Sequence, residues 1–483
     1  MKVDFVSEAE GSHRPAENFL VNAEVAQGSN GHIAADAGKT IEIEDSHGII
    51  FETTYPEAAM FPHLPIFRNL AGLAPLVFFV HSALAATPEQ VNAALGIPLF
   101  ADQSLWDDDA EKTATNIGLR KESQTSTDSS YRLYTDASKR VLGARPYSIA
   151  LYGEGGKVSG VSFMFANKGD SVQDPSEDPK AAKRGPSSLD KQVRAFTKAV
   201  RTDSEALKKA LTTLFGEPKA DLYGKGRQTR ETVKRWDWQG HAILLASPRE
   251  EYVALRVLPT AAADSGAGIR ISDTEMRKRL ASRIQKRPTG DVVLTDIPMV
   301  DQGPKGYCVP ATWERVMRYM GISADMYVLA MAGGTNAGGG TNLDEITEGA
   351  KEAVTMGGRR VDSGTPPLTI QKIRKCVDGG IPIIWQMYSM DSVNDMIDKR
   401  METRTTAMSD PVAWMKSLAN TRRDAKKIKI DPKKGHVCMI IGYNEKTNEV
   451  AVSDSWGPDW AERWMTIEEV VAVSGGKWMT INL

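Results

Sequence analysis

The sequence predicts an α+β protein in which a smaller unit, residues 87–260, precedes a larger unit, residues 291–483. The smaller unit combines alternating segments with one long segment of helical spacing, which is typical of a sheet with a helix across it. The larger unit opens with a helical segment and returns to apolar strands near its end. With 483 residues, 41% hydrophobic and 25% charged, the chain has a globular composition and room for two or three domains.

The N-terminal region divides into a polar stretch and an apolar stretch. Residues 1–59 are polar, glycine-rich and without a sustained period, so we expect them to be disordered or not translated. Residues 60–86 combine a basic start, an apolar run over residues 70–80 and an Ala-x-Ala site that ends at Ala85. This order predicts a signal peptide that begins near Met60, and hence a secreted or periplasmic protein.

Two other accounts of this apolar run remain open. It can be a signal anchor with a short polar tail, or a buried helix of a cytoplasmic protein. Pro75 interrupts the run, which is too short for a comfortable membrane span. We therefore expect no stable membrane insertion once the signal peptide has been cleaved.

The smaller unit is predicted to be an accessory domain with one sheet and one long helix. Residues 146–153 and 157–166 alternate around two glycines, which indicates a β-hairpin. Residues 189–215 carry apolar side chains at helical spacing and are followed by Gly216, a typical helix end. Three further strands are expected at residues 232–238, 241–246 and 252–258.

Residues 261–290 are predicted to join the two units. Residues 261–268 are small and flexible in composition and suit a linker, and residues 274–285 suit a charged helix. Because the unit before the linker has its own strands and helix, we expect it to fold without the larger unit. In the larger unit, the glycine-rich residues 333–340 are expected to form a mobile loop before a helix that Thr341 caps.

Cys308 stands at the start of the predicted helix 308–321. Apolar side chains recur there at three- and four-residue spacing, Pro310 suits the first helical turn, and Gly321 ends the pattern. A helix N-terminus favours the thiolate, which is the nucleophilic form of cysteine. Gln302, in the loop before the helix, can point its amide N–H where the Cys308 backbone N–H points, and two such donors form an oxyanion hole.

His436 is the only histidine after Cys308 among the seven in the chain. It opens an apolar run, residues 436–443, that suits a buried strand. A turn at residues 446–448 leads to a second strand that ends at Asp454. Neighbouring antiparallel strands would bring Asp454 to the imidazole, where it fixes the tautomer. Trp456 would shield that hydrogen bond from water.

The order Gln302, Cys308, His436, Asp454, with Ser-Trp-Gly after the aspartate, resembles papain-like cysteine peptidases. The Gly-His strand that ends in Gly-Tyr, and an aspartate in the orienting position, are more similar to the bacterial branch of bacteriocin-leader (double-glycine) peptidases. The resemblance covers residues 291–483 and implies the papain-like fold. It also implies that Cys308 is the nucleophile, His436 the base, Asp454 the orienting residue and Gln302 the oxyanion donor.

The resemblance further implies a secreted cysteine peptidase that acts on a peptide or protein through a thioester, with no cofactor. Trp456 and Tyr307, which flank these residues in sequence, are the expected substrate contacts. Two departures limit what carries over. Papain has asparagine where this chain has Asp454, and residues 305–309 lack the additional, disulfide-bonded cysteine of papain.

Two alternatives keep the same fold. An amine or a thiol can accept the acyl group in place of water, which would make an acyltransferase of the transglutaminase type. The fold can also be a catalytically silent binding protein, which the complete set of catalytic side chains disfavours.

Net charge and cysteine content limit the kinds of partner and site that the chain can have. The formal net charge of −2 argues against a general nucleic-acid binder. Three cysteines cannot form a disulfide framework, and Cys376 and Cys438 suit core positions, with Cys438 close to the site. No Cys/His spacing predicts a metal site.

Overall fold

The computed structural model describes residues 41–44, 50–53, 86–101, 104–172, 187–248, 251–266, 270–304, 306–337 and 340–483. The chain forms two compact units, Met1–His81 and Ser82–Leu483. In the first unit, β1 (Ile41–Glu44) and β2 (Ile50–Thr53) pair antiparallel. The rest of the expected disordered segment, and the expected signal peptide except Ala86, lie outside the described residues. No helix in the described ranges is long and apolar enough to cross a membrane.

The unit Ser82–Leu483 is mixed α+β, as the sequence predicts, and contains two large sheets. Residues 86–266, here called the N-terminal sheet domain, contribute an antiparallel sheet of order β3-β4-β5-β6-β10-β9-β8-β7. Its strands are β3 (Arg120–Gln124), β4 (Asp128–Tyr134), β5 (Ser148–Glu154), β6 (Lys157–Asn167), β7 (Lys219–Tyr223), β8 (Glu231–Trp238), β9 (His241–Ala246) and β10 (Tyr252–Pro259). Its helices are α1 (Pro88–Leu95), α2 (Ala110–Asn116), α3 (Lys168–Ser171), α4 (Ser187–Phe215) and α5 (Thr260–Asp264).

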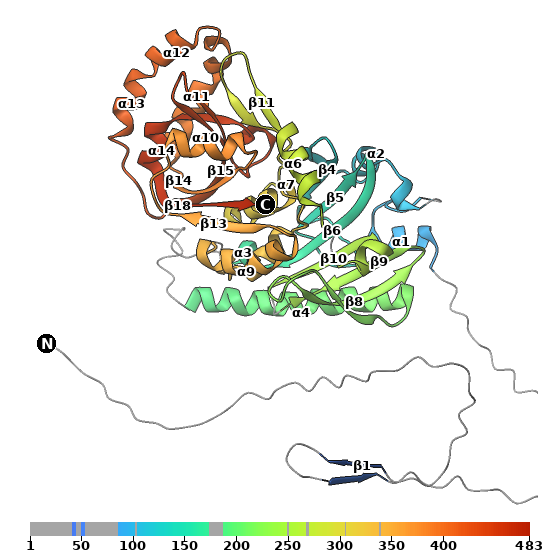
Figure 1. The fold of residues 1–483 in the computed structure, drawn as a ribbon. Coiled ribbons are helices and arrows are strands. Elements are labelled where there is room, and N and C mark those ends of the chain that lie inside the picture. Colours follow the sequence, from blue (N-terminus) through green and yellow to red (C-terminus); the bar gives the residue numbers. More distant parts are fainter. Residues whose placement is uncertain are drawn as a thin grey trace, which may run out of the picture. The chain divides into compact units, whose positions relative to one another are not determined.

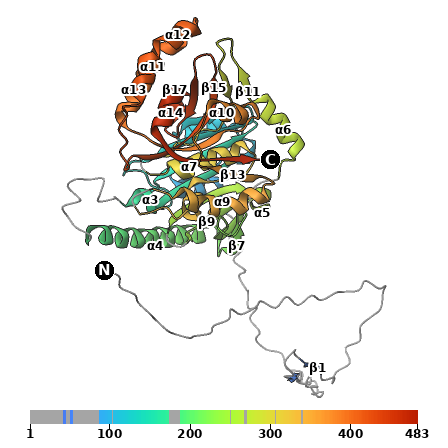
Figure 2. The same cartoon turned by 60° about the vertical axis from the view of Figure 1, so that its left-hand side comes forward.

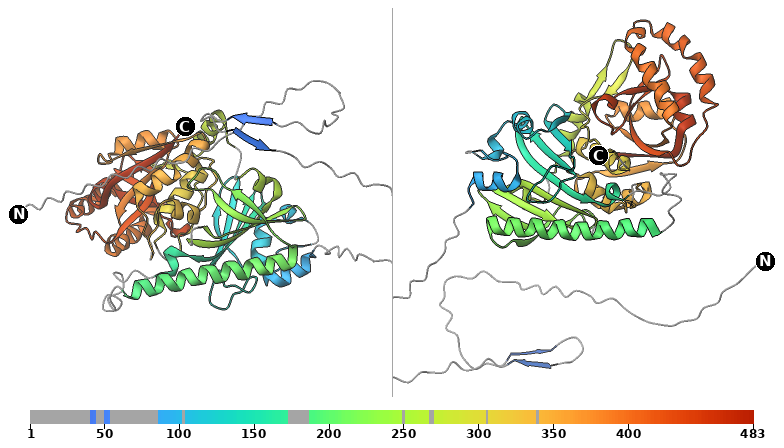
Figure 3. Two further views of the ribbon diagram at one scale, coloured as in Figure 1. Left: turned by 90° about the horizontal axis from the view of Figure 1, so that it is seen from below. Right: turned by 180° about the vertical axis from the view of Figure 1, so that it is seen from behind.

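The long helix α4 lies across one face of this sheet (Figure 1), and Figure 3 shows it from below, across the strands. It buries Phe196, Val200, Leu207 and Leu211 against the sheet and ends before Gly216, whose φ of 83° is the left-handed value of a helix cap. The predicted hairpin and the three predicted strands are all present. Strands β3, β4 and β7 were not predicted.

The other face of the same sheet packs against the C-terminal domain, residues 270–483. Strand β9 shows this arrangement directly, because all six of its residues are buried. Ile243 and Leu245 belong to the cluster that faces α4, whereas Leu244 belongs to a cluster shared with Met326 and Tyr327 of the C-terminal domain. A continuous apolar strand is typical of a sheet covered on both faces, which explains the unbroken apolar run of the sequence.

The C-terminal domain has a sheet of order β11-β12-β15-β14-β18-β13, and β16 and β17 extend it from β15. These strands are β11 (Ile284–Lys286), β12 (Val292–Leu294), β13 (Arg360–Gly364), β14 (Ile383–Tyr388), β15 (Gly435–Asn444), β16 (Glu449–Ser453), β17 (Arg463–Thr466) and β18 (Ser474–Asn482). Its helices are α6 (Asp273–Ser282), α7 (Cys308–Tyr319), α8 (Met326–Ala332), α9 (Leu343–Met356), α10 (Ile370–Asp378), α11 (Asp391–Ala407), α12 (Pro411–Ser417), α13 (Ala419–Ala425) and α14 (Ile467–Val473).

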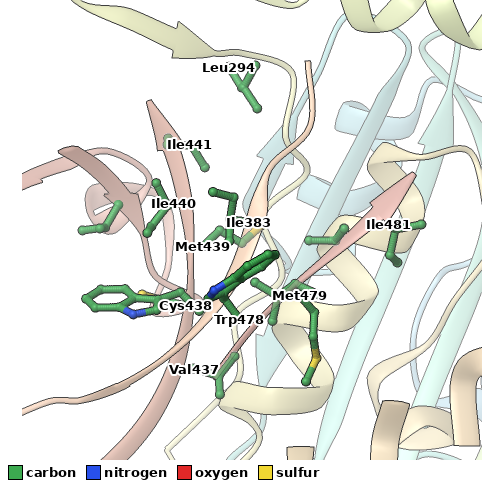
Figure 4. Close-up of a cluster of buried hydrophobic side chains, with 14 of the residues drawn as sticks. Leu294, Ile383, Val437, Cys438, Met439, Ile440, Ile441, Trp478, Met479 and Ile481 are labelled. Carbon is green, nitrogen blue, oxygen red and sulfur yellow. The ribbon is translucent and has the colours of Figure 1, made fainter. Parts of the chain in front are cut away.

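The core of the C-terminal domain lies between this sheet and its helices. Successive residues of β15, Val437 to Ile441, contribute to it from both faces of the strand, beside β14 and β18 (Figure 4). Helices α11, α12 and α13 stand together at one end of the domain (Figure 2). The predicted turn at residues 446–448 joins β15 to β16, and Asn448 adopts a φ of 52° in it.

Three local expectations were wrong in detail. Residues 261–264 of the expected linker lie in α5, and Ala263 is buried in the cluster shared with the C-terminal domain. Asn342, rather than Thr341, caps α9, because its side chain accepts from two backbone N–H groups of the first turn. The expected helix 274–285 ends at Ser282, since Ile284 already pairs with Leu294 in β11.

Candidate active site

Cys308 is the first residue of α7, as the sequence predicts. The helix buries the predicted apolar face, with Trp313, Val316 and Met317 at 1% exposure or less. The side chain of Cys308 itself is half-buried. Because the free N–H groups of the first turn lie at this end of the helix, the position favours a thiolate.

His436 lies on β15, which contacts α7. The Thr312 hydroxyl, one turn after Cys308, donates to the Val437 carbonyl at 3.1 Å and ties the nucleophile helix to the strand that carries the imidazole. His436 is 7% exposed, and its Nε2 lies 2.8 Å from Asp454 Oδ1. Nδ1 is therefore the ring nitrogen left for the Cys308 thiol.

Asp454 follows β16 and is buried with both carboxylate oxygens in use. The pairing of β16 with β15 places Ser453 opposite Met439 and so brings the aspartate to the His436 side of the sheet. Oδ1 contacts His436, and Oδ2 accepts from the Arg463 guanidinium at 2.6 Å. Asp454 thus stands between two groups that favour its ionised form.

The three groups shift one another's proton affinity. Burial would lower the pKa of His436, but hydrogen bonds and charge interactions with Asp454 and Cys308 raise it to about 10. Burial would raise the pKa of Cys308, but the hydrogen bond and charge of His436 outweigh it, so the pKa is lowered. Burial also opposes ionisation of Asp454, yet His436 and Arg463 lower its pKa. The shifts of Cys308 and His436 both favour a thiolate beside an imidazolium.

Trp456 covers the imidazole. Its ring centroid lies 4.9 Å from that of His436 with an interplanar angle of 32°, and the Arg463 guanidinium lies 5.2 Å from the same indole. The indole therefore lies at the position predicted for a side chain that shields the hydrogen bond between His436 and Asp454 from water. Trp456 is half-buried, and substrate contact by its exposed part remains a prediction.

Tyr307 is placed differently from the expectation. Its side chain is 2% exposed, and its hydroxyl donates to Asn167 Oδ1 at 2.8 Å and accepts from the Gly169 N–H at 3.1 Å. The ring thus points into the N-terminal sheet domain, where a substrate does not reach it. The expected substrate contact is not made by this side chain, because its hydroxyl is satisfied inside the molecule.

Gln302 lies in the loop between β12 and α7. Its backbone N–H donates to the Ser455 carbonyl at 2.8 Å, which places the loop beside the residue that follows Asp454. In the described part of the chain, its side-chain oxygen is buried without a hydrogen-bond partner. A half-turn of the amide exchanges oxygen for nitrogen and presents an N–H at the same position.

Arg315 and Arg463 support the site and were not predicted. The buried Arg315 guanidinium donates to the Asp454 carbonyl at 2.8 Å, to Ser453 Oγ at 2.6 Å and to the Pro298 carbonyl at 3.0 Å. It thereby fixes the segment that carries the aspartate to the nucleophile helix. Arg315 could have been predicted, because it is a charged residue on the inner face of α7, seven positions after Cys308. The sequence around Arg463 gives no comparable indication.

The other cysteines and the second described histidine lie outside this arrangement. Burial raises the pKa of the half-buried Cys376, and burial also raises that of Cys438, whose Sγ lies 3.6 Å from Met387 Sδ. His241 is buried in the N-terminal sheet domain, with Nδ1 3.0 Å from the Trp238 carbonyl oxygen. Across the described ranges, no group of His, Cys, Asp and Glu side chains is arranged to hold a metal ion.

The pKa shifts predict a broad pH profile for a reaction that uses the ion pair. The rate should rise with pH through the lowered pKa of Cys308, as thiolate forms, and fall as pH rises through the raised pKa of His436, about 10, because a neutral imidazole cannot give a proton to the leaving group. Measuring kcat/KM against pH checks this. An alkaline limb near the ordinary histidine pKa of 6.5 would contradict the raised value.

The comparisons with known proteins support the assignment of the C-terminal domain. Residues 294–481 match the Peptidase_C39 like family, a stretch that starts at the end of β12 and includes Cys308, His436 and Asp454. No curated protein matches the chain. Residues 294–481 therefore form a Peptidase_C39-like domain, of a papain-like family akin to the bacteriocin-processing peptidases, which confirms the resemblance read from its motifs.

Proposed function

We propose that the protein is a cysteine peptidase in which Cys308 is the nucleophile, His436 the general acid and base, and Asp454 the residue that orients the imidazole. The observation that carries this proposal is the His436 ring. One of its nitrogens is bonded to a buried aspartate at 2.8 Å, and the ring shares a hydrogen bond with a thiol at a helix start. The match to a peptidase family supports the same reaction class.

The reaction follows from the ion pair. The Cys308 thiolate forms a C–S bond to the carbonyl carbon of the scissile peptide, whose oxygen takes the negative charge. The His436 imidazolium gives its proton to the leaving nitrogen as the C–N bond breaks, which leaves a thioester. Neutral His436 then takes a proton from water as the water attacks the thioester. Cleavage of the C–S bond releases the acid product and restores the thiolate and the imidazolium.

The negative oxygen needs donors that are fixed before the reaction. The Cys308 backbone N–H, at the start of α7, has no acceptor within the helix. The Gln302 amide is the second donor in this proposal, since its loop is held beside Ser455 and the amide has a buried, unpartnered end in the described structure. Trp456 excludes water from the bond that orients the imidazole.

Selective alkylation combined with a cleavage assay tests the proposed function. At mildly acidic pH, iodoacetamide should label Cys308 much faster than Cys376 or Cys438, whose pKa values are raised by burial. An unlabelled portion of the same preparation should cleave peptides from a mixed library, and the Cys308→Ala protein should not. Cys376→Ser is the matched control, because it removes a half-buried thiol outside the site.

The outcomes separate the alternatives. Equal labelling of the three cysteines would argue for a catalytically silent fold. Fast labelling of Cys308 with transfer of the acyl group to an added amine, but no hydrolysis, would identify an acyltransferase instead.

A further inference from the structure

The loop that carries Gln302 is held in large part by the N-terminal sheet domain, outside the matched family domain. Strand β3 supplies two acceptors to its backbone. Ser123 Oγ accepts from the Met299 N–H at 2.9 Å, and Glu122 Oε1 accepts from the Asp301 N–H at 2.8 Å. Asp301 is the residue directly before Gln302, so Glu122 fixes the peptide that leads into the proposed oxyanion donor.

Glu122 is itself rigidly held. It is 4% exposed, its Oε1 also accepts from Arg132 Nε at 2.6 Å, and its Oε2 accepts from Ser130 Oγ at 2.9 Å. Both partners lie on β4, the neighbouring strand of the sheet. A buried carboxylate that accepts from three donors has little conformational freedom, so it holds the loop in a fixed position relative to the sheet.

Tyr134, also on β4, holds the other side of the same residue. Its hydroxyl donates to the Asp301 carbonyl at 2.7 Å. Its ring lies against Gly303, where a Cβ would stand 2.9 Å from the ring, and Gly303 has a φ of 75°. The N–H and the C=O of Asp301 are therefore both bound by the N-terminal sheet domain.

The C-terminal domain holds the flanking positions of this loop. Arg315 binds the Pro298 carbonyl, and the Ser455 carbonyl accepts from the Gln302 N–H. Further along, Tyr307 directly precedes Cys308 and is bonded to Asn167 and Gly169 of the N-terminal sheet domain. Partners from both domains thus hold residues 298–303, and the N-terminal sheet domain also holds Tyr307.

We propose that Glu122 and Tyr134 are positioning residues that set the place of the Gln302 amide for catalysis. This inference rests on the proposed function, because it assigns the N-terminal sheet domain a part in that reaction. An oxyanion donor works by being fixed before the charge develops, and a loop held by one domain alone would leave the amide free to move. The sheet acts on Gln302 through Asp301 and Gly303 and does not touch the reacting atoms.

Tyr134→Phe is the sharpest variant, since it removes one hydroxyl and keeps the ring that packs on Gly303. We expect kcat to fall by roughly tenfold or more. The loss should not exceed that of Gln302→Ala, which is about a hundredfold. KM and the rate of Cys308 alkylation should not change, because α7 and β15 hold the thiolate. Tyr152→Phe is the matched control: its ring, on β5 of the same sheet, lies 5.6 Å from the Arg318 guanidinium.

A double-mutant cycle separates positioning from a general structural effect. If Tyr134 acts through the amide, Tyr134→Phe should cause no further loss of kcat in the Gln302→Ala background. An unchanged kcat in Tyr134→Phe, or an equal loss in both backgrounds, would overturn the proposal. Glu122→Gln, which keeps an acceptor oxygen for Asp301, should retain more activity than Glu122→Ala.

A readout without turnover distinguishes this proposal from the proposed function. Hydrogen exchange at the Asp301 and Gly303 amides should be faster in Tyr134→Phe than in the wild-type chain, and unchanged in Tyr152→Phe. If the wild-type chain cleaves no peptide but the exchange result holds, the proposed function fails while the hold on the loop stands. Unchanged exchange in Tyr134→Phe would reject the hold itself.

Discussion

Replacement of His436 by alanine should abolish peptide cleavage, with kcat/KM lower by roughly a million-fold. In the proposed mechanism, the imidazole is the proton donor for the leaving amine and the cation beside the thiolate. Without it, burial remains the largest effect on the pKa of the Cys308 thiol and raises it, opposed by the backbone hydrogen bonds with Val437 and Val309 and by the helix start. The alkylation rate of Cys308 at mildly acidic pH should therefore fall together with turnover, and both are measured on one preparation.

Cys438→Ala is the control for this variant. Cys438 lies two residues further along β15 and is fully buried, with its Sγ against Met387. The substitution disturbs the same strand without removing a group of the proposed triad, so activity should be largely kept. A His436→Ala protein that still alkylates fast at Cys308 would show that the helix start alone sustains the thiolate, and would reject the ion pair.

Replacement of Asp454 by asparagine should cost about 10⁴-fold in kcat. From the sequence alone, this substitution is expected to be milder than His436→Ala, since an amide oxygen can still orient the imidazole. The structure gives a reason for the size of the remaining loss, because the second carboxylate oxygen accepts from Arg463 at 2.6 Å. Asparagine cannot accept from both partners, so its NH₂ group would face either the guanidinium or the ring N–H of His436.

Asp398→Asn is the matched control, since Asp398 accepts from the same guanidinium at 2.8 Å but is 47% exposed at the surface. It should change kcat little, because Asp454 keeps the Arg463 contact. The measurement is single-turnover acylation by a peptide ester together with the melting temperature. A fully active Asp454→Asn protein would mean that Arg463 moves away and that the aspartate acts only through geometry.

The parts of the site that the sequence predicted are those with a local signal. Cys308 is predicted from its position at a helix start, and His436 and Asp454 from two strands joined through a short turn. Arg315 and Arg463 act through contacts between segments that are distant in the sequence. The sequence around an arginine does not identify its hydrogen-bond acceptor. Tyr307 was misassigned for the same reason, because its partner, Asn167, lies 140 residues away.

The fold shows the same limit at β3 and β4. Strand β3 has the sequence Arg-Lys-Glu-Ser-Gln, which is too polar to predict a strand from apolar alternation. Its buried positions are Glu122 and Ser123, the two residues that bind the Gln302 loop. The strand is polar because its inner side chains bind a backbone segment and not an apolar core, and only the tertiary structure reveals that requirement.

The strand β9, buried on both faces, bears on how this protein can change over evolution. Its aliphatic side chains each belong to one of two cores, and Ala242, Leu244 and Ala246 share theirs with residues of the C-terminal domain. Interiors are close-packed, so a change of volume at one of these positions requires a matching change in the other domain. The N-terminal sheet domain is therefore expected to tolerate substitutions at this surface only together with matching substitutions in the C-terminal domain. We expect the two domains to change in sequence as a pair.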